Sequence, residues 1–142
     1  MAPLAAEHLA PFLLAGRARF TIVSKATGTR FTYQVRKPKK GGVFFVSVLT
    51  GADNESAYTY LGFVPADRPS EFIHGGQKAT IDRDAPSAKA LAWAWPRLTN
   101  GDLPTTCEVH HEGRCGRCGR ALTVPESIAA GLGPECAGKG GM

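Results

Sequence analysis

The feature that most constrains this chain is a cluster of cysteine and histidine residues near its C-terminal end. Cys115 and Cys118 form a C-x-x-C pair followed by glycine, and a third cysteine, Cys136, comes 18 residues later. A gap of two residues lets both thiolates bind one metal ion, and glycine permits the tight turn that this requires. The sequence shows no secretory signal and no apolar run that could span a bilayer, so we expect a cytoplasmic protein with reduced thiols. These cysteines therefore predict a Zn²⁺ site.

A closed structural zinc site needs four ligands, so one more residue must join the three cysteines. The candidates are His111, Cys107 and His110. His111 lies four residues before Cys115, and Gly113 between them allows a hairpin that brings the imidazole to the ion, so we rank His111 first and Cys107 second. The pair lacks the thioredoxin-like βαβ setting of a redox motif, and four candidate ligands indicate a filled, structural ion instead of a catalytic one.

The region after residue 104 is expected to form a small zinc-finger domain, covering residues 105–142, of the treble-clef or zinc-ribbon type. Thr123 and Glu126 have the spacing of a capping box, which predicts a short helix ending at Ala130. Glycine and proline then turn the chain so that the last cysteine can reach the C-x-x-C pair.

Residues 1–104 are expected to form a β-rich domain. Apolar and polar residues alternate in Ala18–Ser24 and in Thr29–Arg36, which predicts a hairpin with one apolar face and one basic face. Val43–Thr50 is apolar on both faces, as in a central strand, and Ala57–Val64 alternates again. The expected fold class is α+β, in which a small antiparallel sheet with one packed helix is followed by the zinc finger.

Two helical segments are predicted beside these strands. Residues 3–15 favour helix, and Pro11 is expected to break or restart it. A second helix is expected near residues 86–95, capped by Asp84 and ended by Pro96. Its apolar side chains recur at i, i+3, i+4 and i+7, a stripe that would pack on the sheet.

Positive charge is concentrated in the first part of the chain. The formal net charge is +5, and residues 1–40 hold eight basic residues against one acidic residue. Such a stretch suits a phosphate backbone or an acidic protein. Tyr58 and Tyr60 share one strand face, where they either stack on bases or pack in the core. The cations expected to bind nucleic acid are Arg17, Arg19, Arg30, Arg36, Lys37, Lys39, Lys40, Arg114 and Arg117.

The string HEGRCGRCGRALTVPESIAAGLGPEC resembles the C-terminal zinc-finger motif of small uncharacterised proteins encoded by phages, prophages and plasmids. Upstream, LLAGRARFTIVS, TGTRFTYQV and FFVSVLTGADNESAYTYLG resemble the β-rich part of many of the same proteins. The resemblance implies a mobile-element origin, a bacterial host cell and bound zinc, and it names no reaction. It places the zinc ligands at His111, Cys115, Cys118 and Cys136.

From the sequence we expect a small zinc-containing accessory protein of a phage or mobile element that binds nucleic acid mainly through its basic hairpin, with weak sequence specificity. The alternative is a protein-binding inhibitor of a host enzyme or defence complex. A nucleotide-binding loop, a G-x-S-x-G motif and a convincing pair of carboxylates are all missing from the sequence, so we do not expect an enzyme.

Overall fold

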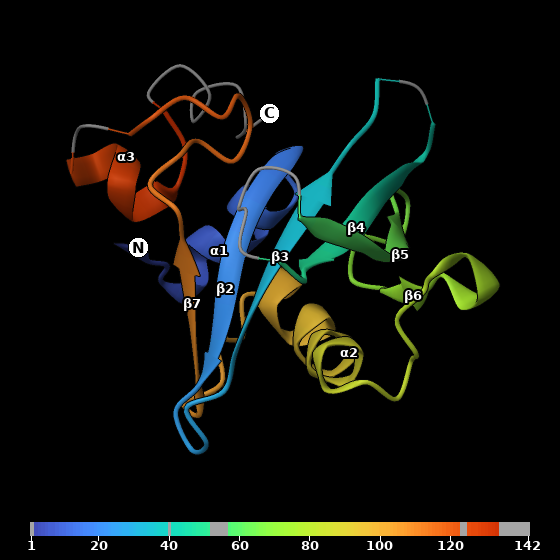
Figure 1. Ribbon diagram of the computed structural model, residues 1–142. Helices are drawn as coiled ribbons and strands as arrows, with labels where there is room; N and C mark the ends of the chain where they lie inside the picture. Colours follow the sequence, from blue (N-terminus) through green and yellow to red (C-terminus); the bar gives the residue numbers. More distant parts are fainter. Residues whose placement is uncertain (1, 40, 52–56, 123–124, 134–142) are drawn as a thin grey trace.

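A computed structural model of the chain describes residues 2–39, 41–51, 57–122 and 125–133. Its centre is an antiparallel sheet with the strand order β1-β7-β2-β3-β4-β5-β6 (Figure 1). The strands are β1 (Ala2–Pro3), β2 (Arg17–Ser24), β3 (Arg30–Arg36), β4 (Val43–Leu49), β5 (Tyr58–Pro65), β6 (Ile73–His74) and β7 (Cys107–His111). The helices of the described residues are α1 (Ala6–Leu13), α2 (Pro86–Thr99), α3 (Pro125–Ala130) and the 3-10 turn η1 (Gly76–Lys78).

Strands β2 to β5 are consecutive in the chain and adjacent in the sheet, so the predicted antiparallel sheet is confirmed. In β2 the side chains of Phe20 and Ile22 are buried, and the register places Phe20 opposite the buried Tyr33 of β3. Gly28, at φ 74°, closes the turn between these two strands. Because side chains alternate across a strand, this register gathers the apolar residues on one face of the sheet.

Helices α1 and α2 cover that apolar face (Figure 1). Phe12 of α1 and Trp95 of α2 are fully buried in the core that they share with the strands. The indole Nε1 of Trp95 donates a hydrogen bond to the carbonyl of Pro69 at 2.8 Å, and the hydroxyl of Tyr33 donates to the carbonyl of Ser87 at 2.7 Å. None of the helices in the described ranges is long and apolar enough to cross a membrane.

The expected ends of both helices need correction. Pro11 lies inside α1 without breaking it, and Pro96 lies inside α2, which continues to Thr99. Each proline removes one backbone donor, and burial of the apolar stripe outweighs that loss. The expectation that Asp84 caps α2 is wrong, because the N-cap residue is Ala85, whose side chain has no hydrogen-bonding group.

Strand β7 ties the C-terminal part of the chain to the sheet. It lies between β1 and β2, with Val109 opposite Ile22 and His111 opposite Phe20. The sequence assigned this segment to a zinc-finger domain of residues 105–142, separate from a β-rich domain of residues 1–104. The sheet therefore extends past the expected boundary, and the residues that follow β7 begin at the edge of the core.

Candidate nucleic-acid interface and metal centre

The sheet face opposite α1 and α2, here called the open face, presents polar and aromatic side chains in rows. The rows form because the register aligns the outward residues of four neighbouring strands. Adjacent strands lie ~4.8 Å apart, so a side chain on β2 stands roughly 10 Å from its row partner on β4. One row is Arg17, Arg36, Phe45 and Phe63, and the next is Arg19, Gln34, Ser47 and Tyr60.

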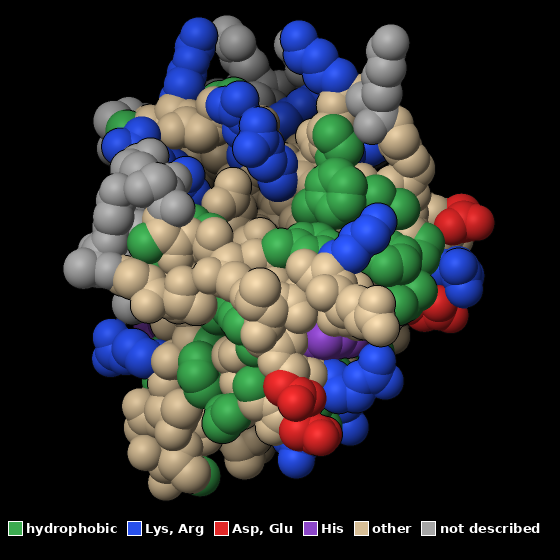
Figure 2. All heavy atoms as spheres, turned by 45° about the vertical axis from the view of Figure 1, so that its right-hand side comes forward, with side chains coloured by type: hydrophobic (Ala, Val, Ile, Leu, Met, Phe, Trp, Pro, Cys, Tyr) green, Lys and Arg blue, Asp and Glu red, His purple; other side chains and the backbone are tan. Residues whose placement is uncertain are grey.

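The open face is hollowed between these rows and the C-x-x-C loop, which we define as residues 114–121. The hollow, here called the basic basin, has a volume of about 980 Å³. Figure 2 shows Lys and Arg side chains gathered at one end of the molecule beside a patch of hydrophobic side chains. Glu112 is the single acidic residue among the described residues that line the basin. The lining cations are Arg17, Arg19, Arg36, Lys39 and Arg114.

The cations of this basin differ in their contacts with the rest of the protein. Within the part of the chain that the structure describes, neither Arg36 nor Lys39 makes an ion pair. The guanidinium of Arg19 lies over the ring of Tyr58, 5.6 Å from its centroid. A concave wall with mostly positive charge concentrates the electric field, an arrangement that favours polyanions as ligands.

The other predicted cations lie elsewhere. Arg30 pairs with Val23 at the far end of the β2–β3 hairpin. The ammonium of Lys37 lies 5.5 Å from the ring centroid of Phe44, a core residue that faces the helices. Arg117 is exposed in the C-x-x-C loop and does not line the basin, and Lys40 lies outside the described residues.

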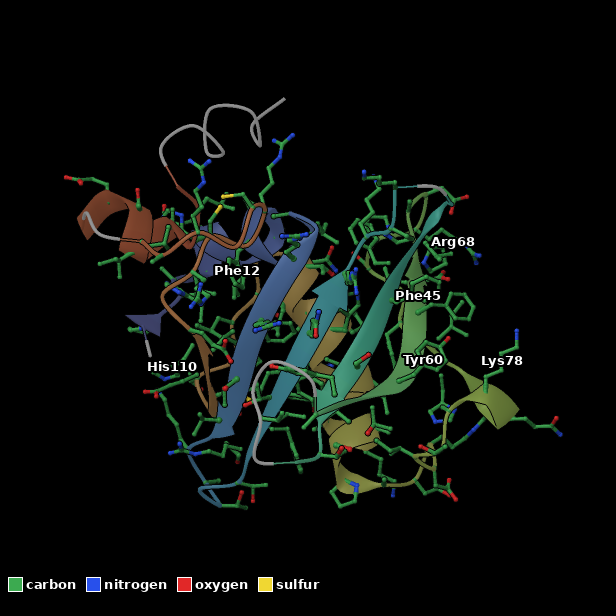
Figure 3. The ribbon with its side chains drawn as sticks, turned by 45° about the horizontal axis from the view of Figure 1, so that its top comes forward. Phe12, Phe45, Tyr60, Arg68, Lys78 and His110 are labelled. Carbon is green, nitrogen blue, oxygen red and sulfur yellow. The ribbon has the colours of Figure 1, made fainter. Side chains whose placement is uncertain are left out.

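Aromatic side chains form the β4–β5 side of the open face. Phe45 is 43% exposed, and its ring meets that of Tyr60 edge-on, with centroids 6.1 Å apart (Figure 3). Tyr58 and Tyr60 are half-buried and are not part of the core cluster. Of the two sequence interpretations of these tyrosines, the position on the open face favours a surface role over core packing.

The C-x-x-C loop is a tight turn fastened to the sheet and to α3. The amide of Cys115 donates to the carbonyl of Arg120 at 2.8 Å, and Gly119, at φ 80°, donates to the carbonyl of Cys115 at 2.9 Å. The amide of Gly116 donates to the carbonyl of Gly131, just after α3, at 2.8 Å. A side chain at Gly116 would meet the ring of Phe12, so this position requires glycine.

The same loop forms one wall of the basin and holds two of its cations. A guanidinium nitrogen of Arg17 donates to the carbonyl of Cys118 at 3.5 Å. A guanidinium nitrogen of Arg114 donates to the carbonyl of Gly119 at 3.2 Å. The conformation of the C-x-x-C loop therefore decides where these two positive charges point.

The thiol of Cys115 is prepared to carry a negative charge. Burial raises its pKa, but hydrogen bonds from the backbone amides of Gly133, Cys118 and Arg117 and from the Cys118 side chain lower it further, to about 7. The amide nitrogen of Arg117 is 3.4 Å from Cys115 Sγ. Amides directed at a sulfur atom favour the thiolate that a metal ion binds. The two thiols of this loop thus fit a thiolate-binding cation.

His111, the first-ranked fourth ligand, is buried and uses both ring nitrogens in the protein. Its Nε2 donates to the carbonyl of Ile128 in α3, and its Nδ1 accepts a hydrogen bond from the amide of Gly113 at 2.9 Å. Burial lowers the pKa of His111, which favours the neutral ring that these two bonds require. To bind a metal ion, His111 would have to give up one of these bonds.

Of the two other candidates, Cys107 lies away from the C-x-x-C loop and His110 has a contact of its own. Cys107 pairs with Ser24 at one end of β2, whereas the loop contacts Arg17 at the other end, roughly 20 Å away along the strand. His110 faces the open side of the sheet, where its Nε2 lies 3.1 Å from a carboxylate oxygen of Glu108 (Figure 3). Cys136 lies outside the described residues, and those residues contain no group of three or more His, Cys, Asp or Glu side chains arranged to bind a metal.

Some residues of the basin were not among the sequence predictions. Phe45 was read as part of a buried strand, and Gln34 and Ser47 were not singled out. Their alternation in β3 and β4 identifies the outward positions. The register that joins them to the arginines of β2 is set by pairings between strands, which one sequence does not specify.

The C-terminal part of the chain has one recognisable relationship. Residues 108–141 match the model of a family of unknown function, DUF6011. Comparisons with curated proteins and with solved structures gave no match. The matched segment contains β7 except Cys107, the C-x-x-C loop and α3.

Proposed function

We propose that this protein binds nucleic acid through the basic basin of the open sheet face, as an accessory protein of the phage or mobile-element kind that its C-terminal sequence resembles. The observation that carries the proposal is the convergence of cations from β2, the end of β3, the loop after β3 and the C-x-x-C loop on one concave surface, whose described lining holds a single acidic residue. Such an arrangement matches a chain of phosphates, whose charge is evenly repeated. Contacts of this kind bind with little dependence on sequence.

We propose in addition that Cys115 and Cys118, together with Cys136 and with His111 as the first-ranked fourth ligand, bind Zn²⁺. The support is the pair of thiols in a tight turn, one of them surrounded by backbone amides. Bound zinc would supply a closed structural site that stabilises the loop. In the stabilised loop, the carbonyls of Cys118 and Gly119 hold the guanidinium groups of Arg17 and Arg114 at the basin.

The proposal is tested by fluorescence anisotropy with labelled single-stranded DNA, duplex DNA and RNA at about 50 and 200 mM salt. We expect binding that weakens steeply with salt for at least one of the three. Flat signals for all three would refute nucleic-acid binding and would direct the search to an acidic protein partner, the alternative that the sequence left open.

A further inference from the structure

The open face combines three kinds of side chain in a fixed order across the strands. Cations stand on β2 and β3, neutral polar groups lie in the middle, and aromatic rings stand on β4 and β5. A nucleotide has the same order, with a phosphate, a sugar and a base in sequence. The question that follows is which form of nucleic acid can present these three groups to one surface.

Phe45 provides the platform for a base. It is one of two large hydrophobic side chains in the described residues that are strongly exposed, at 43%, and it stands in the basin. Tyr60 supports it from the side with an edge-on contact, and Tyr60 itself packs beside Gly75, where a Cβ atom would lie 2.6 Å from its ring. The ring of Phe45 is therefore held in place while part of its surface remains open to a ligand.

A base can stack on this ring only if it is unpaired. In a duplex the bases lie inside the helix and stack on one another, so a flat sheet face reaches the backbone alone. Single strands expose the faces of their bases, and proteins that bind them combine a positive groove with aromatic platforms. The position of Phe45 beside the cations thus selects a single strand.

The middle of the row is suited to a ribose. Gln34 and Ser47 are paired across β3 and β4, and both line the basin. Within the described residues neither side chain makes a hydrogen bond, whereas the hydroxyls of Thr21 and Thr32 in the neighbouring row bond to each other at 2.7 Å. An amide and a hydroxyl each donate and accept, as the 2′-hydroxyl of RNA does.

We propose that the basic basin binds single-stranded RNA, with a base stacked on Phe45, a ribose on Gln34 and Ser47, and phosphates on the cations of β2 and β3. This inference rests on the proposed function and specifies its ligand.

The test uses the full chain and anisotropy with a labelled RNA oligonucleotide, the DNA of the same sequence, and the RNA duplex. We expect F45A to weaken binding of single-stranded RNA by about 5- to 150-fold, the range that stacking of one base corresponds to. F45W should restore it, and the salt dependence should stay unchanged because the phosphate contacts remain. W93A is the matched control, since Trp93 is 44% exposed on α2, on the helix-covered side.

The possible failures are distinguishable. If no oligonucleotide binds with salt dependence, the proposed function itself is refuted. If RNA binding weakens with salt but F45A binds single-stranded RNA like the unsubstituted protein, or the duplex binds as tightly, the stacking inference is refuted and the proposed function stands. Equal affinity for DNA and RNA of the same sequence would overturn the contact with the ribose and the assignment to RNA.

Discussion

Removal of two basin cations should change the salt dependence of nucleic-acid binding by a defined amount. Five cations line the basin, and each phosphate contact of a single strand contributes about 0.7 to the slope of log affinity against log salt concentration. Five contacts give a slope of about −3.5, so binding weakens by roughly 100-fold between 50 and 200 mM salt. With R36S/K39S the slope falls to about −2, and the same change in salt weakens binding by roughly 20-fold.

The control is R30S/K37S, which removes the same amount of charge from the same stretch of sequence. Arg30 lies at the far end of the hairpin, and Lys37 lies over Phe44 on the other side of the sheet. Salt titrations by anisotropy should therefore give the control the slope of the unsubstituted protein. Equal reductions in both variants would refute the basin as the phosphate site, because net charge alone would then account for binding.

Two further predictions concern the C-x-x-C loop and its supports. G131A should lower the free energy of unfolding by about 1–3 kcal/mol in urea titrations, because Gly131 has φ 72° and a Cβ would lie 2.5 Å from the ring of Phe12. G133A is the control, since a Cβ there meets nothing within 4 Å, and equal losses would contradict the argument. Elemental analysis of the purified protein should find one zinc ion per chain. Removal of the zinc by a chelator should weaken oligonucleotide binding by roughly 3- to 10-fold. The reason is that the carbonyls of Cys118 and Gly119 would no longer hold the guanidinium groups of Arg17 and Arg114. Purified protein without zinc would contradict the first part of that prediction, and undiminished affinity after chelation would contradict the second.

Much of the sheet was predictable because its strands follow simple patterns. Alternation in Ala18–Ser24 and Thr29–Arg36 gives the hairpin and identifies its basic face, and both are present in the structure. The role of β7 was not predictable from the same kind of pattern. Cys107, His110 and His111 were interpreted as candidate metal ligands, while the place of the strand between β1 and β2 depends on pairings with distant parts of the chain.

Helix ends and the candidate site likewise depend partly on local sequence and partly on contacts between distant residues. Pro96 was expected to end α2 because proline has a low helix propensity. The helix continues to Thr99 because burial of the apolar side chains around Trp95 outweighs this local preference. Arg36 and Lys37 are consecutive basic residues that the sequence alone does not distinguish, yet they face opposite sides of the sheet. The sequence thus identifies the cations, but only the three-dimensional structure shows which of them line the basin.

The central claim is that the open sheet face is where nucleic acid binds, and amide chemical shifts in a titration of ¹⁵N-labelled protein with single-stranded RNA test it most directly. The claim predicts changes concentrated in β2, β3 and β4, around Arg19, Arg36 and Phe45, and in the C-x-x-C loop. Changes concentrated on α2, around Trp93, or spread without preference over the chain would contradict it.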